Sequence, residues 1–193
     1  MKSIAVFCAS SRGKTDLYFD EARKAGKTLA SEGIRVIFGG SKLGLMGALA
    51  DGALESGGEV IGVLPRFMRK KELEHTRLTE LIYVESMHER KLTMHDLSEG
   101  VIALPGGFGT FEELFEMLTW AQLGLHTKPI GVLNVAGYYD KLLEMFDQMT
   151  EAGLLRTSCK DMVLTADELP SLLEKMRNYQ APPSALDMLE DWT

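Results

Sequence analysis

Short apolar segments alternate along the chain with longer segments in which apolar residues recur at helical spacing. Each short segment is almost entirely hydrophobic, which is typical of strands that are buried on both faces of a parallel sheet. We therefore expect strands at Ile4–Cys8, Arg35–Phe38, Val60–Leu64, Leu81–Val84, Val101–Leu104, Ile130–Leu133 and Met162–Leu164.

The longer segments predict amphipathic helices between these strands. They cover Asp16–Ser31, Leu45–Ser56, Met87–Ser98, Thr110–Leu123, Tyr138–Glu151 and Asp167–Arg177. Gly33, Gly57 and Gly153 stand near helix ends, where glycine commonly stops a helix. The stretch Arg66–Thr79 has no clean apolar face, so we expect an irregular loop or a short helix there.

The alternation of strands and helices predicts an α/β fold. We expect a single Rossmann-like domain over residues 1–180, with a parallel sheet of about seven strands and helices on both faces. A C-terminal tail is expected over residues 181–193, because Ala181-Pro182-Pro183-Ser184 follows the last predicted helix. In open sheets of this kind ligands bind beyond the carboxyl ends of the strands, so candidate site residues are sought there.

Composition and charge narrow the choice of partners. The 193 residues are 45% hydrophobic and 25% charged, as in ordinary globular proteins. The net charge of −7 argues against nucleic acid as a partner, because phosphate backbones are bound by clustered Lys and Arg. The first apolar run is too short for a signal peptide, and no run approaches the ~18 apolar residues of a membrane helix. We expect a cytoplasmic protein with no membrane partner. Cys8 and Cys159 lack metal or redox spacing and are expected to be reduced thiols.

A glycine-rich turn follows the fifth predicted strand and reads Pro105-Gly106-Gly107-Phe108-Gly109-Thr110-Phe111-Glu112-Glu113. Glycines let the backbone approach a ligand closely, and the free N–H groups of a helix start attract anions. Glu112 and Glu113 are expected on the first turn of the helix, where a carboxylate would stand beside a bound phosphate. The alternative is structural, because Thr110-x-x-Glu113 also fits a capping box.

Two other strand ends carry small or hydroxyl residues that could add phosphate or ribose contacts. Ser10 and Ser11 follow the first strand, and Gly40 and Ser41 follow the second. Glycines in such turns usually serve tight turns and helix packing, so each segment alone is a weak signal. Three of them at one edge of a sheet favour a nucleotide-like ligand.

Adjacent cations stand near the start of the helix before the fifth strand. Arg90 and Lys91 occupy a place where the helix dipole disfavours positive charge. Arginine grips phosphate through a planar fork and lysine supplies a point charge, so a binding role is one interpretation. The other is a solvated charged face balanced by Glu85, Glu89 and Asp96.

Known cofactor motifs are missing from the glycine turns. The third glycine of a dinucleotide fingerprint would fall at Glu112, and Leu45 stands where a P-loop lysine belongs. His88 begins a zinc-protease-like motif, but Leu92 replaces its second histidine. We therefore expect no cofactor and no metal, with the histidines at the surface or in packing.

Two motifs together resemble the LOG (Lonely Guy) family of cytokinin-activating phosphoribohydrolases. They are Met87–Lys91 and Pro105–Glu113. Supporting similarity lies in Val6–Ser11, Gly39–Gly47, Gly57–Pro65 and Thr119–Gly124, and it extends to about Gly153. Ala9 stands where a glycine is common in the family, and Phe108 where tyrosine is common. Neither departure removes a charged group, although Ala9 could narrow the pocket.

The resemblance implies hydrolysis of the N-glycosidic bond of a nucleoside 5′-monophosphate, giving free base and ribose 5-phosphate. Family substrates are cytokinin riboside monophosphates and AMP. By position, Arg90 and Glu113 match the catalytic pair. The matching substrate-binding positions are Glu72, Lys91, Gly107, Phe108, Gly109, Thr110, Phe111, Glu112 and Thr119. The resemblance also implies a homodimer.

The implied chemistry is physically consistent. The reaction passes through an oxocarbenium-like state, so a carboxylate such as Glu113 can stabilise the charge or activate water. Backbone donors at Gly107 to Thr110 would fix the phosphate, and Arg90 would position the substrate. Two alternatives stay open: a non-catalytic nucleotide or cofactor carrier on the same fold, and a transferase or lyase acting on a phosphorylated metabolite. The family is often labelled a possible lysine decarboxylase, but no residue context here supports a cofactor-binding lysine.

Overall fold

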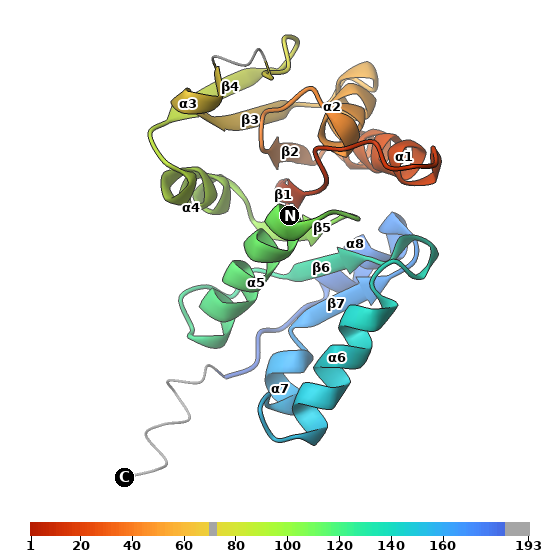
Figure 1. Ribbon diagram of the computed structural model, residues 1–193, viewed down its shortest axis with the longest axis vertical. Helices are drawn as coiled ribbons and strands as arrows, with labels where there is room; N and C mark the ends of the chain where they lie inside the picture. Colours follow the sequence, from red (N-terminus) through yellow and green to blue (C-terminus); the bar gives the residue numbers. More distant parts are fainter. Residues whose placement is uncertain (70–72, 184–193) are drawn as a thin grey trace.

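The computed structural model describes residues 1–69 and 73–183, and its centre is a parallel sheet. Seven strands form the sheet in the order β4-β3-β2-β1-β5-β6-β7 (Figure 1). Their bounds are β1 Ser3–Phe7, β2 Arg35–Phe38, β3 Val60–Pro65, β4 Glu80–Val84, β5 Gly100–Ala103, β6 Ile130–Leu133 and β7 Val163–Ala166. The predicted parallel α/β sheet is confirmed, because neighbouring strands of the sheet pair in parallel throughout.

Helices connect the strands. Their bounds are α1 Leu17–Ser31, α2 Gly44–Glu55, α3 Arg66–Arg69, α4 Met87–Leu97, α5 Phe108–Gln122, the 3-10 helix η1 Val135–Gly137, α6 Asp140–Glu151, α7 Thr157–Lys160 and α8 Leu169–Arg177. The segment after β3 is indeed a short helix at its start, as the weak pattern there allowed. Helix α7 was not predicted, and Thr157–Lys160 is too short to show a helical period.

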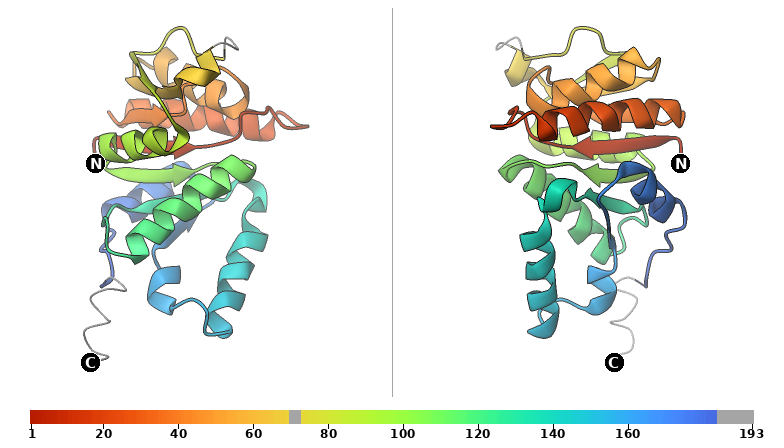
Figure 2. Two further views of the ribbon diagram at one scale, coloured as in Figure 1. Left: turned by 60° about the vertical axis from the view of Figure 1, so that its left-hand side comes forward. Right: turned by 90° about the vertical axis from the view of Figure 1, so that its right-hand side faces the viewer.

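The helices cover both faces of the sheet, as Figures 1 and 2 show. Strand residues alternate between two cores, so that Val6 faces one of them and Phe7 the other. The first core contains residues of α1, α2 and α8. The second contains residues of α4 and α5, and the ring of Phe115 on α5 packs against Phe146 on α6 with 5.8 Å between centroids.

The strand order reverses at β1, which pairs with β2 on one side and with β5 on the other. Chain connections leave in opposite directions from this point, and a crevice opens beyond the carboxyl ends of the two strands. The loops that leave these ends contain Ser10 and Ser11 after β1 and the turn Pro105–Gly107 after β5. The topology therefore brings the loop after β1 and the glycine turn after β5 together at one edge of the sheet.

The chain from β1 to α8 contributes to this one sheet and its covering helices. Of the expected tail, residues 184–193 lie outside the described part of the chain. Within the described residues, no helix has both the length and the apolar character needed to cross a membrane.

Candidate active site

A cavity of about 240 Å³ opens at the reversal point of the sheet. Its walls come from the ends of β1 and β5 and from the first turns of α2, α4 and α5. The lining residues are Cys8, Ala9, Ser10, Ser11, Met46, Met87, Arg90, Gly107, Phe108, Gly109, Thr110, Glu112 and Glu113. The cavity thus joins the glycine turn, the predicted arginine and both predicted carboxylates.

The start of α4 is fixed by a reciprocal cap. Ser86 Oγ accepts a hydrogen bond from the Glu89 backbone N–H at 3.1 Å, and Glu89 Oε2 accepts one from the Glu85 N–H at 2.7 Å. These bonds satisfy donors that the helix leaves without partners. Arg90, directly after the cap, points inward and is only 6% exposed.

Arg90 is held by two contacts in the interior. Its Nε donates to the Val63 carbonyl at 3.1 Å, and its Nη1 donates to Glu113 Oε1 at 3.3 Å. Val63 belongs to β3 and Glu113 to α5, so the guanidinium links the sheet to the helix that follows the glycine turn. The interpretation of Arg90 as part of a solvated charged face is therefore wrong.

Gly39 makes room for the Arg90 side chain. A Cβ at this position would lie 1.7 Å from Arg90 Nη2 and 3.3 Å from Met46 Sδ. Gly39 is not among the site residues predicted from the sequence. The sequence does contain a hint, because the glycine pair Gly39-Gly40 directly follows a buried strand. Only the structure shows that the space left by Gly39 is occupied by the Arg90 guanidinium.

Glu113 lies on the second turn of α5, and the expectation that the carboxylates occupy the first turn is wrong. The helix starts at Phe108, with Gly107 as its N-cap in extended conformation, because the Phe111 N–H already bonds to the Gly107 carbonyl at 3.1 Å. No side chain caps this helix end, so the capping box of Thr110 with Glu113 does not form. Glu113 is free to pair with Arg90 instead.

Burial dominates the electrostatics of Glu113, which is 5% exposed. Loss of water raises the pKa of its carboxyl to about 7, although the guanidinium of Arg90 opposes the shift. The thiol of Cys8 lines the same cavity, and burial followed by the charge of Glu113 raises its pKa as well, so it stays protonated. The cavity therefore contains a carboxyl group that changes charge near neutral pH.

The glycine turn presents backbone to the cavity. A Cβ at Gly107 or Gly109 would meet nothing within 4 Å, so a ligand can approach the chain closely there. At Gly106 a Cβ would lie 2.0 Å from Thr110 Oγ1, which shows how tightly the turn folds onto the helix. The first backbone N–H groups of α5 have no acceptor within the helix, so this end suits an anion.

Several other predicted residues do not line the cavity. Gly40 packs beneath side chains of β3 and β4, and Ser41 Oγ accepts a hydrogen bond from the Leu43 N–H at 3.2 Å. Phe111 packs on the ring of Tyr139 at 5.7 Å in the second core. Thr119 Oγ1 donates to the Phe115 carbonyl at 2.7 Å, and the residue borders a separate groove beside α6.

The three remaining predicted residues are Lys91, Phe108 and Glu72. Lys91 is buried behind the lining, in contact with Glu112 and Glu116. Phe108 stands at the mouth with 96% of its surface exposed. Glu72 lies outside the described residues.

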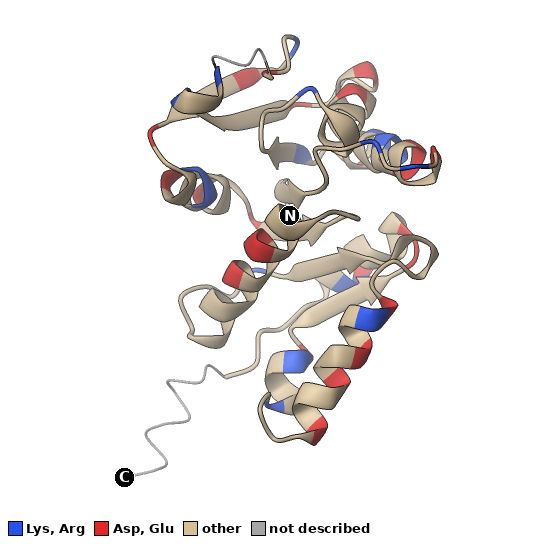
Figure 3. Cartoon of the chain, in the orientation of Figure 1, with Lys and Arg blue, Asp and Glu red and all other residues tan. Residues whose placement is uncertain are grey.

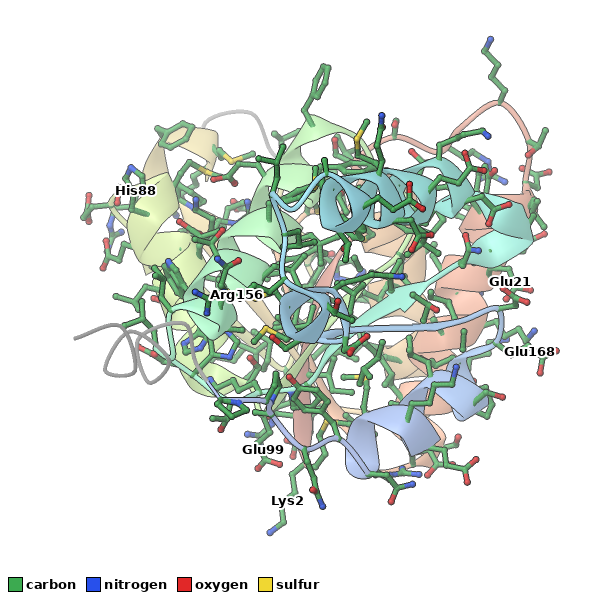
Figure 4. All side chains as sticks on the ribbon, turned by 90° about the horizontal axis from the view of Figure 1, so that it is seen from below. Lys2, Glu21, His88, Glu99, Arg156 and Glu168 are labelled. Atoms are coloured by element: carbon green, nitrogen blue, oxygen red, sulfur yellow. The ribbon has the colours of Figure 1, made fainter. Side chains whose placement is uncertain are left out.

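The four histidines lie apart from this cavity. His88 is exposed and points away from the molecule (Figure 4). His75 Nε2 contacts Asp51 Oδ1 at 3.1 Å, while His95 and His126 pack on each other with 4.9 Å between ring centroids. Among residues 1–69 and 73–183, no three His, Cys, Asp or Glu side chains gather closely enough to hold a metal ion.

Acidic and basic residues are distributed along the chain, and opposite charges meet between α4 and α5 at the site. Figure 3 shows acidic bands on α5 and a basic band on the neighbouring α4. Arg90 and Lys91 on α4 face Glu113 and Glu112 on α5 through two ion pairs. Consecutive residues of one helix are thus paired with consecutive residues of the other.

Comparison with known proteins identifies the relatives of this chain. Residues 46–176 match the profile of a family described as "Possible lysine decarboxylase". The rice protein "Probable cytokinin riboside 5'-monophosphate phosphoribohydrolase LOGL1" is 42% identical, covering 97% of this chain and 86% of its own length. The Arabidopsis thaliana protein "Cytokinin riboside 5'-monophosphate phosphoribohydrolase LOG3" is 41% identical, covering 92% of this chain and 83% of its own length.

A solved structure shares the fold at lower sequence similarity. The molybdenum cofactor binding protein from Rippkaea orientalis superposes with a TM-score of 0.68 at 21% identity, covering 92% of this chain and 96% of that one. At this identity the likeness concerns the fold alone, because one fold hosts many functions.

Proposed function

Because the chain belongs to the LOG family of cytokinin riboside 5′-monophosphate phosphoribohydrolases, we propose that it hydrolyses the N-glycosidic bond of nucleoside 5′-monophosphates. The products are the free base and ribose 5-phosphate, and the protein is an N-glycosyl hydrolase. The observation that carries this proposal is the pair Arg90–Glu113 inside a cavity bordered by the glycine turn.

The glycine turn and the start of α5 supply the phosphate site. Unpaired backbone N–H groups and the helix dipole at Phe108 to Thr110 favour the 5′-phosphate there. Gly107 and Gly109 leave the approach open, and Ser10 and Ser11 also line the cavity. A phosphate bound at this end places the ribose further along the cavity, toward Glu113.

Glu113 supplies the chemistry. As the bond between the anomeric carbon and the base nitrogen breaks, the bonding electrons leave with the base, which takes up a proton to become the neutral free base, and positive charge develops on the sugar. The Glu113 carboxylate stabilises that charge and accepts a proton from the water whose oxygen bonds to the anomeric carbon. A carboxyl with a pKa of about 7 is well matched to this proton transfer at neutral pH.

Arg90 positions this carboxylate and the substrate. Its contacts with Val63 and Glu113 fix the guanidinium between sheet and helix, where it can also contact substrate oxygens. Its positive charge favours the ionised form of Glu113 against the effect of burial. Without this counter-charge, the carboxyl would remain protonated to higher pH.

The alternatives fit the site less well. A nucleotide or cofactor carrier has no need of a buried carboxyl that titrates near neutral pH, and the named relatives are hydrolases. A decarboxylase that uses a Schiff base needs a lysine of lowered pKa. Burial acts to lower the pKa of Lys91, but its bonds to Glu112 and Glu116 outweigh burial and raise it.

The substrates we propose are cytokinin riboside 5′-monophosphates and AMP, and we propose a cytoplasmic homodimer. The exposed apolar side chains of Met87 and Phe108 beside the cavity support association of two copies. Met94 and Met117, by contrast, are fully buried in the second core. A solution mass of 21.4 kDa by light scattering, the mass of one chain, would exclude the dimer.

The test is an assay of base release with product identification. The purified protein is incubated with AMP, GMP, CMP and isopentenyladenosine monophosphate, and the products are separated and identified by mass. We expect equal amounts of free base and ribose 5-phosphate from AMP and from the isopentenyl compound. Release of nucleoside and inorganic phosphate, or no reaction with any of the four, would contradict the proposal.

A further inference from the structure

A second group of charges lies between α4 and α5 beside the Arg90–Glu113 pair. Lys91 Nζ forms an ion pair with Glu112 and lies 2.9 Å from Glu116 Oε2. The Lys91 side chain is 4% exposed and does not belong to the cavity lining, whereas the Glu112 side chain is 56% exposed and does. Glu112 therefore faces the cavity, and Lys91 lies behind it.

The buried ammonium needs more than one counter-charge. A buried lysine is costly unless it is paired and hydrogen-bonded, and Glu112 alone would have to serve both Lys91 and the cavity. Glu116 stands one helical turn after Glu112 and presents its carboxylate on the same side of α5. Its side chain is 22% exposed, so its ion pair with Lys91 is better protected from water than the ion pair of Glu112.

We propose that Lys91 and Glu116 are positioning residues, in which Glu116 holds the Lys91 ammonium and Lys91 holds the Glu112 carboxylate at the cavity wall. Glu112 then accepts hydrogen bonds from the sugar hydroxyls of the substrate. This assignment rests on the proposed function and deepens it. It gives Lys91 an indirect role, in place of the direct substrate contact that the resemblance implied, and it gives Glu116 a role for the first time.

The same group also acts on Glu113 through charge. The charged and titratable groups around Glu113 are Cys8, directly after β1, Arg90 and Lys91 from α4, and Glu112 and Glu116 from α5. Lys91 lowers the pKa of Glu113, and Glu116 raises it. Removal of either charge should therefore shift the ionisation of Glu113, in opposite directions.

The experiment compares Glu116→Gln and Lys91→Met with wild type, using AMP and isopentenyladenosine monophosphate. The acidic limb of the profile of kcat/KM against pH reports the ionisation of Glu113 in the free enzyme. We expect this limb to move to lower pH in Glu116→Gln and to higher pH in Lys91→Met. Glu144→Gln, which removes a carboxylate from the exposed Lys141–Glu144 pair on α6, is the matched control and should keep the wild-type profile.

A second measurement does not depend on turnover. We expect the dissociation constant of ribose 5-phosphate, measured by calorimetry, to rise roughly tenfold in Glu116→Gln, as for loss of a charge-assisted hydrogen bond. Glu112→Gln removes the proposed sugar contact itself, and the double variant Glu112→Gln/Glu116→Gln should bind no more weakly than Glu112→Gln alone, because Glu116 acts through Glu112. Glu116→Asp, which keeps the charge, should lie between wild type and Glu116→Gln and serves if the glutamine variant fails to fold.

The outcomes separate the two proposals. If the wild type releases no base, the proposed function is wrong, while the ribose 5-phosphate affinities still decide whether Glu116 positions Glu112. Shifts of the pH profile in the same direction for both variants would overturn the positioning role. So would additive losses of affinity in the double variant, since they would show that Glu116 acts independently of Glu112.

Discussion

At the scale of single residues, the site depends on two buried charges that compensate each other. Arg90 and Glu113 are both nearly excluded from water, and each would be costly without the other. Removing one partner of such a pair commonly costs about 3–5 kcal/mol, because the remaining charge stays buried. Gly39 is the small residue that allows this arrangement, since any side chain there would occupy the space of the guanidinium.

This role of Gly39 gives a direct prediction for Gly39→Ala. The new Cβ would collide with the flexible end of Arg90 and not with backbone, so the fold should persist with a small change in melting temperature. The guanidinium must move away from Glu113, and we expect kcat/KM to fall by about 100-fold, as for a small misplacement of a catalytic group. Steady-state kinetics with AMP, together with a thermal melt, measures both effects.

The double variant Gly39→Ala/Arg90→Ala shows whether the effect passes through Arg90. If it does, the double variant should be no less active than Arg90→Ala alone. A wild-type rate in a folded Gly39→Ala protein would show that the position of Arg90 is unimportant for the reaction.

At the scale of helices and strands, most of the fold could be predicted from the sequence. The strands at Arg35–Phe38 and Ile130–Leu133 match the structure at both ends, and the other predicted boundaries lie within two residues of the observed ones. The largest consequence of such a difference concerns α5, which begins two residues before the predicted Thr110. The apolar period shows that a helix follows the turn, but the N-cap is set by the backbone conformation of Gly107, which the period does not report.

The connection between α5 and β6 has its own testable property. Burial, together with the positive charges that His95 and Lys128 can carry, lowers the pKa of His126 to about 4, although the bond between its Nε2 and the Met117 carbonyl opposes the shift. Its Nδ1 accepts a hydrogen bond from the Lys128 backbone N–H at 3.1 Å. The unfolded chain, with a pKa near 6.5, binds a proton that the folded protein does not. Stability should therefore be fully present above pH 6.5 and decrease as the pH falls toward 4.

We expect His126→Gln to lower the melting temperature at pH 7.5 but to weaken its decrease between pH 6.5 and 4. His88→Gln, at an exposed position, is the control and should keep the pH dependence of the wild type. The measurement is the melting temperature of the wild type and both variants between pH 7.5 and 4. An unchanged slope in His126→Gln would show that this histidine does not contribute to acid sensitivity.

At the scale of the whole molecule, the sheet order determines where the chemistry takes place. The alternation of strands and helices predicts a parallel sheet, but the order of its strands depends on contacts between distant segments, which local patterns do not contain. The reversal at β1 brings the loops after β1 and β5 together and places the end of β2 behind Arg90. Because local patterns do not contain these distant contacts, some predicted site residues lie outside the cavity. Gly40 and Ser41 follow a neighbouring strand but support the fold, and Phe111 faces the core.

The central claim is that Glu113 performs the chemistry on a nucleotide held by the glycine turn, and Glu113→Gln tests it most directly. Glutamine keeps the size of the side chain and a hydrogen-bonding oxygen for Arg90, but it lacks a carboxylate that can accept a proton. The measurement is the dissociation constant for AMP by calorimetry together with kcat for base release on the same folded sample. We predict nearly unchanged affinity and a kcat reduced by about 100-fold or more. Base release at the wild-type rate by the folded variant would contradict the account.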